Sequence, residues 1–355
     1  MTNSRDRRLR GLATGGARSV AVVFMLLVGL DASAAPQGGP ARGAPDLVWP
    51  RPPAAARVRF VRSIVTPADW GITPSGFARL MDALTGSTPT HFVRPTGVAE
   101  RDGILYVADP GAQALFVLDA PRGEVREMHR IGDETLVSPV AVALGPGDLV
   151  FVADSWLKKV IVLDRLGRWQ RAISAPELLR PAAVVYDPAR DRLYVADSAR
   201  HQIVVFSAAG QLLHVIGSRG KGDGEFNSPT HLALAGHGEL LITDALNYRV
   251  QAFDAAGHFL WRIGRHGDGS GDFASPKGVA TDSSGDVYVV DALFDAVQIF
   301  QEDGALLLGF GQRGTGAGEF WLPGGLFIDA EDAIYVADSY NHRIQVFQRV
   351  RAFGP

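Results

Sequence analysis

The ionisable side chains best placed for acid–base chemistry are those of His231 and Lys277. Each follows a proline that recurs along the chain, so the two occupy similar positions in neighbouring repeats. A histidine and a lysine held close together can exchange protons with a substrate. The alternative is that His231 only packs at the start of a strand. Neither a Ser-His-Asp order nor a histidine spacing typical of metal sites supports catalysis.

A second set of candidates consists of large apolar and basic side chains on predicted turns. Such apolar side chains are costly to expose to water and often mark partner surfaces, although they can also fold back onto neighbouring repeats. Basic and polar residues near the recurrent prolines extend the set. The predicted binding residues are Arg94, Trp156, Lys158, Arg180, Thr230, His231, Lys277, Phe294, Tyr340 and His342.

Three glycine-rich segments, residues 216–226, 263–273 and 310–320, share one pattern. Glycine at every second position can indicate a phosphate-binding loop, but the lysine-serine ending and the following helix of that motif are missing. Turn geometry is the better explanation of these glycines. The segments align three cationic residues at a regular spacing, which predicts a solvent-exposed arc on three consecutive repeats: Arg219, His266 and Arg313.

These residues lie within six copies of one phrase, most complete as VADSYNHRIQVF at residues 336–347. Its aspartate recurs every 43 to 47 residues, a period typical of propeller blades. We expect these aspartates to accept backbone N–H groups of the following turn, with a cation-binding ring of carboxylates as the alternative. Arg249 and Arg343 are predicted partners of the same turn. The six aspartates are Asp109, Asp154, Asp197, Asp244, Asp291 and Asp338.

Each copy contains four short strand signals separated by Gly, Asp and Asn turns. The sequence therefore predicts an all-β, six-bladed β-propeller of four-stranded antiparallel blades. The last copy lacks an outer strand, so residues 57–64 are expected to fill that edge and close the ring. A 65–94 insert follows, with one short helix predicted from Ser75 to Gly86. Loops that enter first strands and turns that join second to third strands should share one face, here called the loop face.

The repeats resemble NHL repeats, most closely at residues 336–347, 241–253 and 193–206. The resemblance implies a six-bladed NHL propeller of the exported bacterial type. That family includes RNA-binding and ubiquitin-ligase-associated propellers, a peptide amidoglycolate lyase and extracellular sensor domains. The resemblance thus implies the fold more strongly than any activity. The metal ligands of the lyase have no matching residues in this chain.

The N-terminal residues predict export. Five arginines precede an 11-residue apolar run, Val20–Leu30, and an Ala-Ser-Ala segment, the order typical of a signal peptide. Cleavage is expected after Ala34, and the run is too short for a membrane span. We therefore predict a signal peptide at 1–34, a Pro/Gly-rich extended linker at 35–56 and the propeller at 57–355. Localisation should be periplasmic or secreted.

The composition restricts the classes of partner and site that the chain can have. The formal charge of −3 for the 355 residues becomes more negative without residues 1–34, which disfavours nucleic acid. The chain has no cysteine, which excludes disulfides and thiolate zinc sites. No cofactor is predicted, with calcium or zinc at the channel mouth as the alternative. The sequence predicts a monomeric binding or scaffold module, without a membrane span when mature, for a protein, peptide or glycan partner. A lyase or hydrolase at the channel mouth is the second interpretation, and RNA binding the third.

Overall fold

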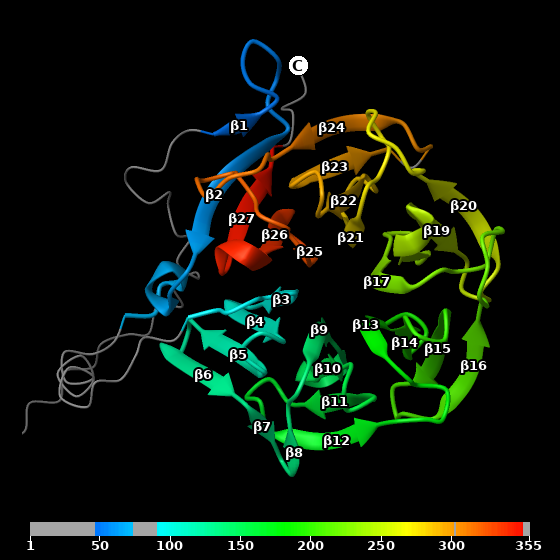
Figure 1. The fold of residues 1–355 in the computed structure, drawn as a ribbon. Coiled ribbons are helices and arrows are strands. Elements are labelled where there is room, and N and C mark those ends of the chain that lie inside the picture. Colours follow the sequence, from blue (N-terminus) through cyan, green and yellow to red (C-terminus); the bar gives the residue numbers. More distant parts are fainter. Residues whose placement is uncertain (1–46, 74–90, 302, 351–355) are drawn as a thin grey trace, which may run out of the picture. The chain divides into compact units, whose positions relative to one another are not determined.

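The computed structural model describes residues 47–73, 91–301 and 303–350, all within one compact unit, Pro40–Pro355. The predicted signal peptide and the predicted helix from Ser75 to Gly86 lie outside the described residues. Six antiparallel sheets form the predicted six-bladed β-propeller, with the first strand of each blade nearest the centre (Figure 1). Within the described ranges, helical structure is limited to short 3₁₀ turns, the first being η1 (Pro67–Trp70).

The first three blades each contain four consecutive strands. Blade 1 is formed by β3 (Gly97–Arg101), β4 (Ile104–Asp109), β5 (Ala114–Asp119) and β6 (Glu124–Met128). Blade 2 is formed by β9 (Pro139–Leu144), β10 (Val150–Asp154), β11 (Lys159–Leu163) and β12 (Trp169–Ile173). Blade 3 is formed by β13 (Pro181–Asp187), β14 (Arg192–Asp197), β15 (Gln202–Ser207) and β16 (Leu212–Ile216). A small hairpin separates the first two blades, made of β7 (Arg130–Ile131) and β8 (Glu134–Thr135).

The remaining blades follow the same order, except for the last. Blade 4 is formed by β17 (Pro229–Leu234), β18 (Leu240–Asp244), β19 (Arg249–Phe253) and β20 (Phe259–Ile263). Blade 5 is formed by β21 (Pro276–Thr281), β22 (Val287–Asp291), β23 (Ala296–Phe300) and β24 (Leu306–Phe310). Blade 6 is formed by β25 (Leu326–Ile328), β26 (Ala333–Asp338), β27 (Arg343–Arg349), β2 (Val58–Ile64) and β1 (Val48–Trp49).

The core is distributed between blades rather than gathered at the centre. Six clusters of buried apolar side chains each combine residues of two successive blades. The second and third strands carry most of these side chains because both of their faces lie against a neighbouring blade. This arrangement explains why the sequence shows continuous apolar runs there, such as LYVAD and IVVF, instead of strict alternation.

Strand β2 closes the ring, as predicted. It pairs antiparallel with β27, with Phe60 opposite Phe347 and Ile64 opposite Ile344. Val58 and Ile64 are fully buried, and they join the core clusters on the two sides of blade 6. The ring closure therefore combines backbone pairing with burial on both faces of the blade.

The segment predicted as a Pro/Gly-rich extended linker, residues 35–56, contains one short strand, Val48–Trp49, which the sequence analysis did not predict. This strand pairs with Val58 and Arg59 as the fifth strand of blade 6. The Trp49 ring lies 5.7 Å from that of Phe310 and 5.8 Å from that of Phe347, between centroids. Contacts of one tryptophan with two phenylalanines stabilise a strand that the surrounding prolines would otherwise disfavour.

Candidate functional site

The structure confirms that blade-entry loops and second-to-third strand turns share a face. In blade 2, Asp154 accepts hydrogen bonds from the N–H groups of Val137 and Ser138 in the entry loop, at 2.9 and 3.0 Å. Its other carboxylate oxygen accepts the N–H groups of Trp156 and Leu157 in the turn, both at 3.0 Å. One buried carboxylate thus fixes two loops together.

The remaining five aspartates make comparable contacts, and all six have no solvent exposure. The prediction that they accept N–H groups of the following turn is confirmed for Asp109, Asp154, Asp197 and Asp291. Two further acceptors, Asp244 and Asp338, bind side chains of that turn instead. All six also bind backbone N–H groups of the entry loop, which the sequence did not predict. These carboxylates are therefore parts of the scaffold.

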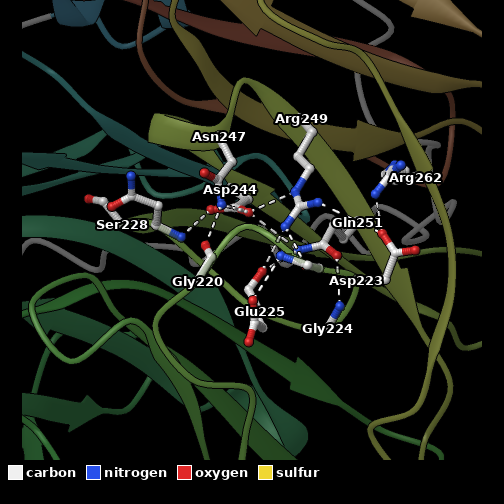
Figure 2. Close-up of polar contacts among 12 residues, drawn as sticks. Gly220, Asp223, Gly224, Glu225, Ser228, Asp244, Asn247, Arg249, Gln251 and Arg262 are labelled. Carbon is white, nitrogen blue, oxygen red and sulfur yellow. Dashed lines mark hydrogen bonds and ion pairs between the residues drawn. The ribbon is translucent and has the colours of Figure 1, made fainter.

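Arginine strengthens this arrangement in blades 4 and 6. Arg249 Nε donates to Asp244 at 2.9 Å, and the same guanidinium donates to the Glu225 carbonyl oxygen at 2.9 Å (Figure 2). It also donates to the Gly222 carbonyl oxygen at 2.8 Å. Arg343 repeats these contacts with Asp338 and the 310–320 loop. The prediction that both arginines are partners of the turn is confirmed, and both are buried.

The fourth residue after each aspartate is in the left-handed backbone region in all six turns. Several of these residues contact the entry loop of the next blade. His201 accepts the Ser228 N–H at 2.9 Å, and Asp295 accepts the Leu322 N–H at 2.7 Å. His342 hydrogen-bonds to the Val93 carbonyl, across the closure between blades 6 and 1. His342, predicted as a binding residue, therefore takes part in ring closure. Lys158 holds the same position in blade 2 and is exposed.

His231 and Lys277 lie near the loop-face end of the central channel, on first strands β17 and β21. Both are half-buried, and Nδ1 of His231 lies 3.2 Å from the Thr230 hydroxyl. Burial, together with the positive charge of Lys277, lowers the pKa of His231 to about 3. Burial also lowers the pKa of Lys277. An imidazole with so low a pKa is neutral at pH 7, and it suits hydrogen bonding better than proton transfer.

The predicted basic residues of the entry loops are exposed. The backbone N–H of Arg94 donates to Asp109, and its side chain is free of the core. Arg180 donates from its backbone to Asp197 and from Nε to the Ser198 hydroxyl, at 2.9 and 3.1 Å. Both side chains therefore extend from a backbone that a buried aspartate fixes.

Exposed apolar side chains gather on the loop face. At the second position after the aspartate, Trp156, Leu246, Leu293 and Tyr340 are 73%, 56%, 62% and 43% exposed. Phe294 beside them is half-buried. The sequence analysis missed a second group, Val93, Leu179 and Trp321, each two residues before the opening proline of a blade. That constant spacing was the signal that could have revealed them. None of the seven exposed residues belongs to a core cluster.

The three glycine-rich loops fold alike, as the turn interpretation predicts. Each has a bridge between its cationic residue and the phenylalanine seven positions later, for example between Arg219 and Phe226. Arg219, His266 and Arg313 are all exposed. The environment of Arg313 differs from the others, because its guanidinium lies 6.0 Å from the centre of the Trp321 ring.

A cavity of about 500 Å³ occupies the half of the channel remote from the loop face. The C-terminal halves of the six first strands line it, and none of the ten predicted binding residues is among its lining residues. Its charged residues, which the sequence analysis missed, include Glu100, Arg101, Asp329 and Glu331. Glu100 had a recognisable signal: the other five blades place Leu, Tyr, Leu, Thr and Ile at the same distance from the opening proline.

Glu100 carries an unusual carboxyl group. Burial raises its pKa from 4.5 to about 7, and Asp329, Glu331 and Asp102 contribute in the same direction. The Gly103 N–H opposes the shift by donating to Oε1 at 2.7 Å. The group therefore titrates close to neutral pH.

This shift predicts a pH-dependent effect of Glu100→Gln on stability. Between pH 4.5 and 7 the folded state holds a proton that the unfolded state has released, so this residue makes unfolding easier as pH rises through that window. Glutamine stays neutral and can still accept the Gly103 N–H. The Tm of the variant minus that of the wild type should thus increase from pH 4.5 to pH 8. A Tm difference between the variant and the wild type that stays constant from pH 4.5 to pH 8 would contradict the raised pKa of Glu100.

Among residues 47–73, 91–301 and 303–350, no group of three or more His, Asp or Glu side chains is arranged to hold a metal ion. In the same ranges no helix is long and apolar enough to span a membrane.

Comparisons with known proteins agree with the six-bladed propeller fold. The NHL repeat family matches residues 320–347, and a family described as a 6-bladed beta-propeller matches residues 185–239. No curated protein matches the sequence significantly. Virginiamycin B lyase from Staphylococcus aureus is similar in structure, with 13% identity, a TM-score of 0.55, and coverage of 73% of this chain and 96% of that chain.

Other similar structures carry different functions. A chain of a nidogen/laminin complex has 20% identity and a TM-score of 0.53, with 69% of this chain and 86% of that chain covered. An auxiliary nutrient binding protein from Bacteroides thetaiotaomicron has 13% identity and a TM-score of 0.57, with 72% and 69% covered. Identities this low support the fold alone. The chain is a six-bladed β-propeller, and its residues 320–347 match the NHL repeat.

Proposed function

We propose that this propeller is an exported binding module that recognises a protein or peptide partner through its loop face. The observation that carries the proposal is the group of seven exposed apolar side chains on that face. They extend from turns whose backbone is fixed by buried aspartates, so little conformational entropy is lost when a partner covers them. Export rests on the order of charged, apolar and small residues in positions 1–34.

The chemistry of the face favours protein over glycan or RNA. Trp156, Trp321 and Tyr340 offer flat rings, but the other four exposed side chains are aliphatic and offer no flat surface on which a sugar ring or a base could stack: Leu246, Leu293, Leu179 and Val93. Aliphatic and aromatic side chains together resemble the centre of protein interfaces. The acidic net charge of −3 also disfavours a polyphosphate partner.

Replacing Trp156, Phe294 and Tyr340 by alanine tests the proposal. None of the three belongs to a core cluster, so we expect the Tm to change little. Partner capture from a cell-envelope extract should fall about thirtyfold in affinity, because one central aromatic anchor contributes about 2 kcal/mol. The substitution Trp169→Ala is the matched control, since Trp169 is exposed on outer strand β12.

Two outcomes of that experiment would contradict the proposal. Unfolding of the triple variant would show that these side chains pack against the blades. A stable variant that captures the same partners at the same affinity would move the interface away from the loop face.

An enzyme is the second candidate function, and the cavity around Glu100 favours it. A carboxyl group with a pKa of about 7 suits a general acid or base at neutral pH, and the cavity of about 500 Å³ can hold a small substrate. Elemental analysis of the purified protein distinguishes a metal-dependent enzyme from one that needs no metal ion. Zinc or calcium in a 1:1 ratio to protein would favour it, and its absence would leave only metal-free chemistry at Glu100.

A further inference from the structure

Blade 6 differs from the other blades in a cluster on its loop face. Arg313, Gly314, Thr315 and Trp321 line a pocket of about 180 Å³. The ring of Tyr340 lies 5.9 Å from that of Trp321, between centroids, at an interplanar angle of 42°. We call Arg313, Thr315, Trp321 and Tyr340 the blade 6 pocket. The equivalents of Trp321 in the preceding two blades are Asn227 and Ala274, which cannot form such a pocket wall.

Hydrogen bonds from the Arg343 and Asn341 side chains fix the backbone of the blade 6 pocket. Arg343 is buried, and its guanidinium donates to the carbonyl oxygens of Thr315, Gly316 and Glu319 at 2.8, 2.7 and 2.9 Å. Asn341 donates to the Gly314 carbonyl at 2.8 Å. Because these bonds exist before any ligand arrives, binding needs little reorganisation of the loop.

Arg313 is available for an anionic group. Its side chain is exposed and lies over the Trp321 ring. None of the ion pairs in the described part of the chain includes Arg313. The one acidic residue in the sequence of this loop, Glu319, is already engaged by the Gly316 N–H at 2.9 Å and by Gln312 at 3.0 Å. A guanidinium stacked on an indole keeps its outer N–H groups free for a carboxylate.

The cation and the two rings together select a ligand with a carboxylate next to an apolar group. We infer that the blade 6 pocket anchors an acidic peptide segment of the partner, with a carboxylate on Arg313 and a neighbouring apolar side chain against Trp321 and Tyr340. This inference rests on the proposed function and specifies the chemistry of its partner. The carboxylate can come from an Asp or Glu side chain or from a peptide C-terminus.

Two fluorescein-labelled peptides distinguish these sources in polarisation measurements with the full chain. One carries an internal Glu-Phe pair and an amidated C-terminus, and the other lacks acidic side chains but ends in Phe with a free carboxylate. We expect saturable binding of at least one peptide, weakened about tenfold by Arg313→Ala and by Trp321→Ala. Higher salt should weaken binding to the wild type more than to Arg313→Ala.

Arg219→Ala is the matched control, because it removes the same charge from the equivalent loop of the preceding repeats, where Asn227 replaces the tryptophan. We expect binding within twofold of the wild type. Equal losses for Arg219→Ala and Arg313→Ala would overturn the inference, since they would indicate unspecific charge attraction. Trp321→Phe retains an apolar ring and should bind better than Trp321→Ala, which keeps the test valid if the alanine variant folds poorly.

Failure of this inference is distinguishable from failure of the proposed function. If the Trp156→Ala/Phe294→Ala double variant, which leaves the blade 6 pocket intact, loses partner capture while Arg313→Ala retains it, the loop face binds and the blade 6 pocket does not. If neither peptide binds the wild type, or if an oligouridine RNA displaces the peptide with higher affinity than the peptide's own, the acidic-peptide assignment is wrong.

Discussion

We expect deletion of residues 57–64 to cause aggregation or a large loss of stability. The deletion removes β2 and leaves the backbone of β27 without its outer partner. An unpaired strand edge invites pairing with other chains. It also removes Val58 and Ile64, which are fully buried in the two clusters beside blade 6. Thermal unfolding and light scattering of the purified variant measure both effects.

Point variants within β2 control for the deletion. Ile64→Ala should reduce the free energy of unfolding by about 2–5 kcal/mol, as expected for a buried isoleucine. Arg59→Ala, at an exposed position of the same strand, should change it by less than about 0.5 kcal/mol. A soluble deletion variant that melts with the wild type would show that the ring does not depend on β2.

The second large effect is expected for Asp338→Ala. This buried carboxylate accepts hydrogen bonds from the Trp321 N–H, Asn341, Arg343 and Gln345 at 2.8 to 3.0 Å. Its loss leaves the buried guanidinium of Arg343 without a counter-ion. Removal of one partner of a buried ion pair typically costs about 3–5 kcal/mol, which denaturant unfolding can measure.

A double variant tests the cause of that loss. In Asp338→Ala/Arg343→Met no charge stays buried without a partner, so part of the lost stability should return. Asp268→Ala provides the surface control, because Asp268 is exposed in the 263–273 loop. If the double variant is as unstable as the sum of the two single variants, the unpaired charge is not the cause.

The fold was predictable because the repeated residues have repeated physical roles. The six aspartates, the opening prolines and the apolar strand pairs occur in every blade, so one assignment could be checked against five others. The missing outer strand of the last copy also identified residues 57–64 by elimination. Val48–Trp49 was missed because its two residues are surrounded by prolines, and Trp49 stabilises the strand only through rings that come from blades 5 and 6.

The candidate site was less predictable because it depends on what differs between blades. Trp156 and Tyr340 were identified, since large apolar residues on turns are unusual by type alone. His342 was selected by type as well, but its contact with Val93 depends on a neighbour far away in sequence. Trp321 and Glu100 occupy recognisable positions in the repeat, but position alone assigns them no role. Their significance arises only from Arg313 in one case and from the shape of the channel in the other.

The position of β2 in the last blade also has a consequence for the order of events during synthesis. The residues that complete blade 6 are among the first and the last of the described chain, and a bond such as that from the Ser339 hydroxyl to the Pro95 carbonyl joins residues 244 positions apart. Contacts so distant along the chain form late and slow folding. Blades 1 to 5 can assemble in order as the chain emerges. Strand β2, by contrast, cannot pair until β27 has been synthesised. The propeller therefore acquires its closed, edge-protected form only after the whole chain is available.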